Sequence, residues 1–310
     1  MSESLPPHRP RLATARTKRA SGGDAGILPE PNKGDSGQTA RTAPTRRRET
    51  GDVRLAWGSA WRRSARRWES LSGRIESATG WKVWNPGRYG ERWHAHFRST
   101  YPVREGGILI FGLNPGPYGM SQTGIPFTDI KRLEAHLPAL AGAIRERDGN
   151  LRLPGLAPRS LHPFLSRTFE SSAVRVYRFL ELGWGSAEEG WRHVTVANGC
   201  SLLFMDRSGK NRTPADLYAA ASRVMGDRRE AKRLLDRCLA ARCLAAKDAV
   251  RALSPRGVVL LGKDTQQALV EEMNRLLGEA GILAWEHPAR AVPDKWARGL
   301  LAELVRRDWK

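Results

Sequence analysis

The chain has few residues of the kinds that build disulfide frameworks or iron–sulfur clusters. Its 310 residues include only three cysteines, Cys200, Cys238 and Cys243, an odd number without regular spacing. That count excludes a four-cysteine iron–sulfur cluster and argues against the disulfide framework of a secreted protein. We interpret Cys243 as a buried residue on an apolar helix stripe that also contains Leu235 and Val250.

Long apolar runs and cofactor motifs are absent as well. No apolar run approaches the roughly 18 residues of a membrane span, and the first residues, MSESLPPHRP, do not resemble a signal peptide. We therefore expect no membrane association and an intracellular location, cytoplasmic near the nucleoid in a bacterium or nuclear in a eukaryote. The glycine-rich residues 112–127 match neither GxxxxGK[ST] nor GxGxxG, and metal ligands do not cluster, so we expect no cofactor and no metal.

Acidic residues are scarce relative to basic ones. The chain has 52 Lys and Arg against 32 Asp and Glu, a formal net charge of +20. Such a balance favours nucleic acid as the partner, because Lys and Arg displace counterions from phosphates. Residues 1–50 carry ten Lys and Arg against five Asp and Glu without apolar periodicity, which predicts a disordered basic tail. We expect residues 51–310 to form a single α/β domain and the protein to be a monomer.

Tryptophans recur at helical spacing after the tail. Trp57, Trp61, Trp68 and Ile75 lie on one face of a predicted helix, with arginines between them. Stacking of these rings on bases is one interpretation, but so regular a stripe favours core packing.

Short apolar runs alternate with helical segments in the remainder of the chain. This alternation predicts a three-layer α/β/α sandwich with a central, mostly parallel four-stranded sheet. The predicted strands are 108–111, 194–197, 258–261 and 282–285, and the further predicted helices are 130–145, 172–182, 214–224, 229–253, 264–279 and 298–307.

A polar residue follows each predicted strand. Asn114, Asn198, Lys263 and His287 come just after the four strands in turn. Ligand sites of parallel α/β sheets lie beyond the carboxyl ends of the strands, so these side chains should converge. None of them is an ordinary nucleophile. The set suits positioning and polarisation of a ligand.

The loop after the first strand is built for rigidity. Pro115 and Pro117 restrict the backbone on both sides of Gly116, and Phe127 ends the segment. The need for a tight turn accounts for two or three of these glycines and prolines. It does not account for Asn114, which lies between the predicted strand and Pro115. The loop therefore predicts a site for a flat ligand.

Residues 112–127 also carry a family resemblance. They differ from Gly-Met-Asn-Pro-Gly-Pro-Phe-Gly-Met-Ala-Gln-Thr-Gly-Val-Pro-Phe only at Leu113, Tyr118, Ser121 and Ile125. This pattern resembles the single-strand-selective monofunctional uracil-DNA glycosylases, within the uracil-DNA glycosylase superfamily. The resemblance covers about residues 65–310 and is weak over 133–170, and the segment after His287 is shorter. Further similar motifs are 84–86, Asn198 with 202–204, 208–214 and 287–288.

The resemblance implies roles for individual residues. Asn114 would position the attacking water and His287 would lie by uracil O2, as the catalytic pair. Phe127 would stack on the extruded base and Asn198 would read its edge. The resemblance places Gly116 and Met120 in the wall of the base-binding pocket near C5 of the base.

The resemblance also implies DNA contacts. The partner would be single-stranded or double-stranded DNA that contains uracil, with 5-hydroxymethyluracil as a further substrate. In the family, the segment after the residue matching His287 enters the duplex and fills the gap left by the flipped base. In this chain that segment is shorter, and Arg290 would be the side chain that enters the duplex. The other candidate DNA-binding residues are Ser208, Gly209, Lys210, Asn211, Lys263 and Lys295.

Two alternatives remain at this point. A glycosylase of another branch of the superfamily would act on deaminated purines or mismatched uracil. A non-catalytic nucleic-acid-binding protein would use the basic tail and the arginine-rich helix, although the set of Asn114, Phe127, Asn198 and His287 argues against it.

Overall fold

The four predicted strands pair in one parallel sheet. In the computed structural model, β2 (Ile108–Gly112) lies between β3 (Val194–Asn198) and β6 (Gly257–Leu261), and β7 (Ile282–Trp285) lies beyond β6. All three pairings are parallel, so the carboxyl ends of the four strands share one edge. The predicted central sheet is confirmed.

The structure describes residues 50–148 and 170–310. All of them belong to one contact unit, Arg46–Lys310. The predicted tail lies outside the described residues apart from Thr50, which begins the first helix, so its disorder stays a prediction. No helix within the described ranges is long and apolar enough to cross a membrane.

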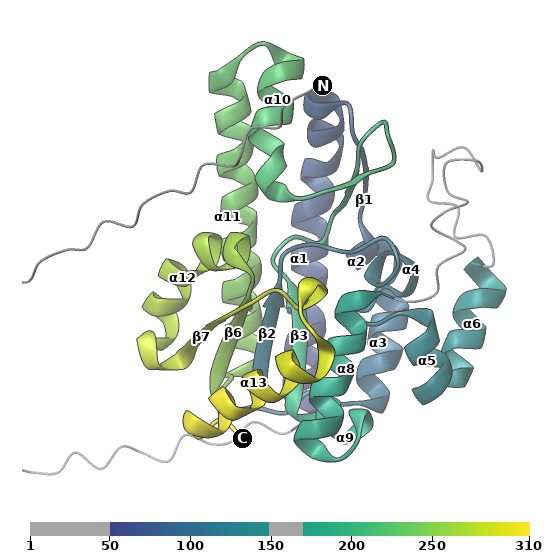
Figure 1. The fold of residues 1–310 in the computed structure, drawn as a ribbon. Helices are drawn as coiled ribbons and strands as arrows, with labels where there is room; N and C mark the ends of the chain where they lie inside the picture. The colour runs from purple at the N-terminus through teal and green to yellow at the C-terminus, as the bar shows by residue number, and fades with distance from the viewer. Residues whose placement is uncertain (1–49, 149–169) are drawn as a thin grey trace, which may run out of the picture. The chain divides into compact units, whose positions relative to one another are not determined.

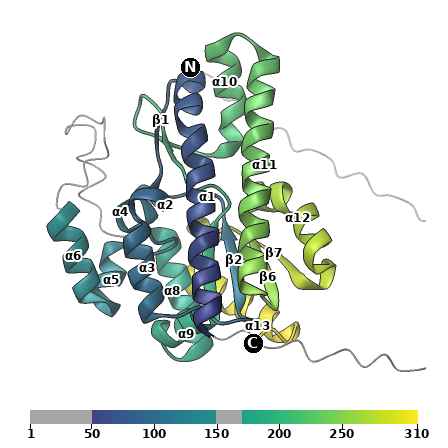
Figure 2. The ribbon, with the colours of Figure 1, turned by 180° about the vertical axis from the view of Figure 1, so that it is seen from behind.

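Helices cover both faces of the sheet, as the sandwich prediction requires. Ile108 and Ile110 of β2 join one apolar cluster, whereas Leu109 and Phe111 join another, because alternate residues of a strand point to opposite faces. The two helical layers lie in front of and behind the sheet in Figures 1 and 2. The first cluster includes α8 (Ser171–Trp184) and α13 (Pro293–Arg306), and the second includes α1 (Thr50–Thr79), α11 (Arg228–Leu253) and α12 (Lys263–Leu277).

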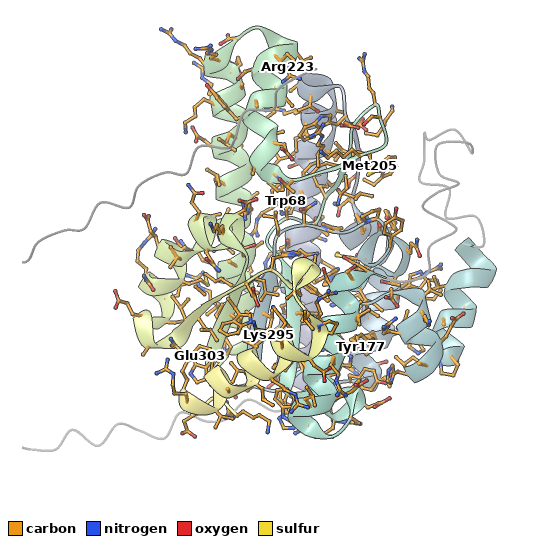
Figure 3. All side chains as sticks on the ribbon, in the orientation of Figure 1. Trp68, Tyr177, Met205, Arg223, Lys295 and Glu303 are labelled. Carbon is orange, nitrogen blue, oxygen red and sulfur yellow. The ribbon has the colours of Figure 1, made fainter. Side chains whose placement is uncertain are left out.

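The tryptophan stripe of α1 is core packing, as predicted. Trp68 and Ile75 are 0% exposed, and Trp57 and Trp61 are also buried. The Trp68 indole N–H donates to the backbone oxygen of Gly199 (3.2 Å), just beyond β3. Figure 3 labels Trp68 on α1. These rings hold the sheet against α1, and the interpretation that they stack on bases is wrong.

The predicted apolar stripe of α11 is confirmed in part. Cys238 is buried, but Cys243 is only half-buried, so the prediction for Cys243 is wrong. The buried face instead contains Ala241, Ala245 and Ala249, and α11 lies alongside α1 in Figure 2. Val250 is buried as predicted, whereas Leu235 is only partly buried. Small side chains permit close approach of two helices, which suits the alanines to the face beside α1.

Several helix boundaries differ from the prediction. The helix expected at 130–145 is two helices, α5 (Ile130–His136) and α6 (Pro138–Asp148), because a proline lacks the N–H needed in a helix interior. The short helices near the sheet were not predicted. They are α2 (Pro86–Tyr89), α3 (Glu91–Thr100), α4 (Met120–Thr123) and α9 (Ala187–His193), while α10 (Leu217–Met225) follows a 3-10 turn, Pro214–Asp216.

A second, antiparallel sheet was not predicted either. It consists of β1 (Lys82–Trp84), β4 (Leu203–Met205) and β5 (Asn211–Arg212), in that order of pairing. Strands of two or three residues are too short to show alternation of apolar and polar residues. This sheet matters for the site because it brings β5 beside the loop that follows β2.

Candidate active site

A cavity of about 290 Å³ lies beyond the carboxyl ends of the sheet strands. The structure brings the six predicted catalytic and base-binding residues together around it, from the ends of three strands and the loop after β2. They are Asn114, Gly116, Met120, Phe127, Asn198 and His287, and the other lining residues are Leu113, Pro117, Tyr118, Glu170, Ser171, Ser172, Asn211, Thr213 and Ala289. We call this cavity the pocket.

Backbone hydrogen bonds hold the two asparagines in register. Pairing of β2 with β3 continues past the strands, through Gly199 N–H to Gly112 O and Cys200 N–H to Leu113 O, both 3.0 Å. The Asn114 side-chain N–H groups donate to the backbone oxygens of Pro115 and Arg212, each at 3.3 Å. Because Nδ2 is bound in this way, Oδ1 is the amide atom suited to accept from a water.

The absence of a side chain at Gly112 shapes the floor of the pocket. A Cβ there would lie 2.5 Å from Cζ of Phe127 and 2.6 Å from Oδ1 of Asn198. The ring and the amide therefore both pack directly on the backbone at the end of β2. The Asn198 amide also contacts Sδ of Met120 at 3.1 Å, which restricts its orientation.

Phe127 has a backbone conformation that bulky residues rarely adopt. Its φ is +52°, in the left-handed region. The side chain of Thr123 supports this turn, since its hydroxyl donates to Thr128 O at 2.9 Å and accepts from Ile125 N–H at 3.1 Å. Strained residues of this kind cluster at ligand sites, where the surrounding structure holds them in place. The strained residue lines the pocket.

His287 lies at the other side of the pocket, after β7. Its Nδ1 accepts from the backbone N–H of Ala289 at 3.2 Å and caps the 3-10 turn Pro288–Arg290. The same residue lines the pocket, so His287 has both a capping role and access to a ligand. An acceptor at Nδ1 places the proton of the neutral imidazole on Nε2. Gly262 permits this arrangement, because a Cβ there would lie 3.1 Å from His287 Cβ.

Glu170 lines the pocket, and no sequence pattern pointed to it. Its carboxyl fills the space beside two glycines, since a Cβ on Gly116 would lie 2.4 Å from Oε1 and a Cβ on Gly119 would lie 1.5 Å from Oε2. The Glu170 carboxyl, and not open space, therefore lies beside Gly116. Burial, and secondarily the charge of Asp129, raises the pKa of Glu170 to about 7.

The basic loop before α10 differs from its prediction. Its backbone donors were expected to be available to a phosphate, but the N–H groups of Ser208 and Lys210 both donate to Oδ1 of Asp206, at 2.9 and 3.0 Å. Although burial opposes the effect, hydrogen bonds from Ser208, Lys210 and Arg212 lower the pKa of Asp206 to about 2. The loop is a tight hairpin held by this carboxylate.

The other predicted DNA-binding residues occupy different places. Ser208, Gly209 and Lys210 are exposed on the hairpin, whereas Asn211 lines the pocket. Among the described residues, Oδ1 of Asn211 is buried without a hydrogen-bond partner. Figure 3 labels Lys295 on α13. Lys263 and Lys295 are exposed at the starts of α12 and α13. Lys263 does not line the pocket, so the prediction that it converges with the two asparagines and His287 is wrong. The side chain of Arg290 lies outside what the structure describes.

The donor set suits no metal site. Within residues 50–148 and 170–310, no group of three or more His, Cys, Asp and Glu side chains could hold a metal ion. The pocket itself offers three amides, one imidazole and one carboxyl. Oxygen and nitrogen donors of this kind suit a planar polar ligand with hydrogen-bonding edges.

The geometry defines a class of protein that binds a flat ligand at the strand ends of an α/β sandwich. A family model described as the uracil DNA glycosylase superfamily matches residues 99–304. The chain is 31% identical over 215 residues to the single-strand selective monofunctional uracil DNA glycosylase of Bos taurus, covering 68% of this chain and 71% of that protein. The corresponding Rattus norvegicus protein is 30% identical, covering 68% and 69%. The chain therefore belongs to the uracil-DNA glycosylase superfamily.

One solved structure is also similar. The crystal structure of Pedobacter heparinus SMUG2 superposes with a TM-score of 0.48 at 19% sequence identity. The match covers 74% of this chain and 90% of that one.

Proposed function

We propose that this protein is a monofunctional glycosylase that hydrolyses the N-glycosidic bond of uracil in DNA. One observation carries the proposal: Phe127, Asn114, Asn198 and His287 converge on a single pocket in a member of the uracil-DNA glycosylase superfamily. Its relatives in cattle and rat, named as uracil-DNA glycosylases, support the same activity.

The deep side of the pocket suits recognition of an extruded base. A base reaches such a pocket only after it leaves the helical stack. Phe127 offers an aromatic platform, and the Asn198 amide offers a donor and an acceptor to the Watson–Crick edge of uracil. Because both pack on Gly112, they are oriented before substrate arrives. Preorganisation reduces the entropy lost on binding.

Asn114 acts by orientation. An amide does not titrate usefully near neutral pH, so it is not a strong general base. Its Oδ1 can accept from a water and direct the oxygen at the sugar carbon, while Nδ2 is held by the backbone of β5. The glycosidic bond then breaks largely before the water attacks.

His287 stabilises the leaving base. Negative charge develops on uracil as the bond breaks, and Nε2–H is the imidazole donor because Nδ1 accepts from Ala289. A donor aimed at O2 in a comparable oxyanion site contributes roughly 3–4 kcal/mol to transition-state stabilisation.

The charge of the chain supports binding to DNA phosphates. A net charge of +20 favours association with both single and double strands in a salt-dependent way. Lys263, Lys295 and the hairpin Lys210 are exposed cations suited to phosphates, and Arg290 is placed in the segment that would probe a duplex.

Deleting residues 1–50 should weaken binding to DNA of any sequence. It should also reduce the slope of the logarithm of the binding constant against the logarithm of the salt concentration. Fluorescence anisotropy at several salt concentrations measures both effects.

A strand-cleavage assay tests the proposed reaction. A labelled oligonucleotide with one uracil is incubated with the protein and treated with alkali, which cuts only at abasic sites. We expect cleavage with uracil and also with 5-hydroxymethyluracil. The activity should be the same in EDTA as in buffer, because the described residues contain no cluster of three or more His, Cys, Asp and Glu side chains that could hold a metal ion. Asn114→Ala should lower single-turnover excision by about 100-fold or more while binding persists. Cleavage of hypoxanthine or xanthine alone would favour the purine-directed branch of the superfamily.

A further inference from the structure

Glu170 occupies a place in the pocket that the rest of the mechanism does not use. Its two carboxyl oxygens lie where side chains on Gly116 and Gly119 would lie, at 2.4 and 1.5 Å from the respective Cβ positions. The carboxyl therefore fits in this place only because residues 116 and 119 have no side chain. The loop after β2 and the residue before α8 are shaped to fit one another.

The backbone of Glu170 is anchored to the loop that carries Phe127. Its N–H donates to Oδ2 of Asp129 at 2.7 Å, while Oδ1 of Asp129 accepts from the N–H of Arg132 at 2.8 Å. Asp129 is 0% exposed, so this junction is rigid. Among the described residues, no donor hydrogen-bonds to the Glu170 carboxyl, although this carboxyl lines the pocket. Its hydrogen-bonding capacity is directed at what the pocket holds.

The base orientation in the proposed function places one ring position beside Glu170. If Asn198 binds N3 and O4 and His287 binds O2, C5 lies next to O4 on the side away from His287. Met120 contacts the Asn198 amide at 3.1 Å, and Gly116 and Glu170 continue the pocket wall from there. This step rests on the proposed function.

We propose that the Glu170 carboxyl hydrogen-bonds to polar substituents at C5 of the pyrimidine and so selects 5-hydroxymethyluracil over thymine. A hydroxymethyl group both donates and accepts, so it pairs with a carboxylate or with a carboxylic acid. A methyl group would remove water from the carboxyl and replace it with nothing, which disfavours thymine. Uracil has only hydrogen at C5 and leaves the carboxyl hydrated. A pKa near 7 keeps both forms of Glu170 populated at neutral pH.

Single-turnover excision by Glu170 variants tests this assignment. Wild type, Glu170→Ala and Glu170→Gln are assayed on single-stranded oligonucleotides of one sequence that carry uracil, 5-hydroxymethyluracil or thymine. Glu181→Gln is the matched control, because Glu181 lies on α8, the helix that begins directly after Glu170, but pairs with Arg178 at the surface. Thermal melting of each variant checks that it is folded.

We expect Glu170→Ala to lower excision of 5-hydroxymethyluracil at least about tenfold relative to uracil, because a site built to bind a hydroxyl depends on that contact. Glu170→Gln, which keeps a donor and an acceptor, should retain the wild-type ratio within about threefold. An equal loss on both bases, or a loss in Glu170→Gln as large as in Glu170→Ala, would overturn the assignment. If wild type removes uracil but not 5-hydroxymethyluracil, the proposed substrate range itself is wrong.

Discussion

The two sides of the pocket are built differently. On the β2–β3 side, defined by Gly112, Phe127 and Asn198, the aromatic ring is 7% exposed and the amide packs on backbone. On the β6–β7 side, defined by Gly262 and His287, the imidazole is exposed and its Nδ1 accepts from the backbone N–H of Ala289. Under the proposed function, a base needs a fixed complementary shape, whereas a side that faces DNA has to meet strands of different geometry. Changes on the first side should therefore impair folding and activity together, and changes on the second should impair activity alone.

Gly112→Ala should have the largest effect. The new Cβ would lie within 2.6 Å of both Phe127 and Asn198, so both recognition groups must shift. We expect single-turnover excision to fall on the order of 10²–10³-fold, because displacements of about 1 Å have such effects. The free energy of unfolding should fall by about 1–3 kcal/mol. Gly142→Ala is the control, since no atom lies within 4 Å of its new Cβ.

His287→Ala should separate activity from stability. We expect excision to fall by roughly 100-fold, because the donor to O2 acts in the transition state. The melting temperature should stay within about 2 °C of wild type, since exposed side chains contribute little to the core. Single-turnover kinetics and calorimetry measure the two quantities. A large loss of stability would place His287 among the structural residues and remove the contrast between the two sides.

Arg290→Ala should affect duplex substrates more than single strands. Unstacking a paired base costs a few kcal/mol that a probing side chain helps to recover, and a single strand has no such cost. We expect single strands to be cleaved faster than U·A duplex, with U·G between them, and the variant to lower duplex excision about three- to tenfold more than single-strand excision. Parallel assays on the three substrates measure this. Equal losses would mean that Arg290 belongs to the pocket.

Glu170→Gln should change how stability depends on pH. The pKa of Glu170 is about 7 in the folded protein and 4.5 ordinarily, so the folded state binds the proton more tightly. Its contribution to stability is complete below pH 4.5 and is lost as pH rises through 7. We expect the variant to be more stable than wild type at pH 8, by on the order of 1–2 kcal/mol, and equal to it near pH 4.5. Urea titrations at both pH values measure the free energy of unfolding. A difference between variant and wild type that is the same at both pH values would contradict this prediction.

Much of the sheet and half of the pocket could be predicted because their signals are local. A buried parallel strand requires a continuous apolar run, so 108–111 and 258–261 were recognisable without knowledge of their neighbours. The residue after such a strand lies at the ligand edge of the sheet by topology alone. This rule located Asn114, Asn198 and His287, and the loop of glycines and prolines at 112–127 located the pocket wall.

Local signals of another kind were present but overlooked. Ser186 accepts from the N–H of Glu189, a capping pair that marks the start of α9. The proline at 138 likewise marked the division between α5 and α6. Short amphipathic segments need such punctuation, since they have too few turns to show a helical period.

The sequence by itself determined the sandwich, its strand ends and the rigid loop, because apolar runs, prolines and glycines act on the chain nearest to them. Only the tertiary structure decided which groups meet. It placed Glu170 against Gly116 and Gly119, turned the donors of the basic hairpin toward Asp206, and brought the Arg212 carbonyl to the Asn114 amide. Those contacts join residues far apart in the chain or depend on the exact path of a loop. Their energies depend on distances of a few ångströms, which no pattern of residue types contains.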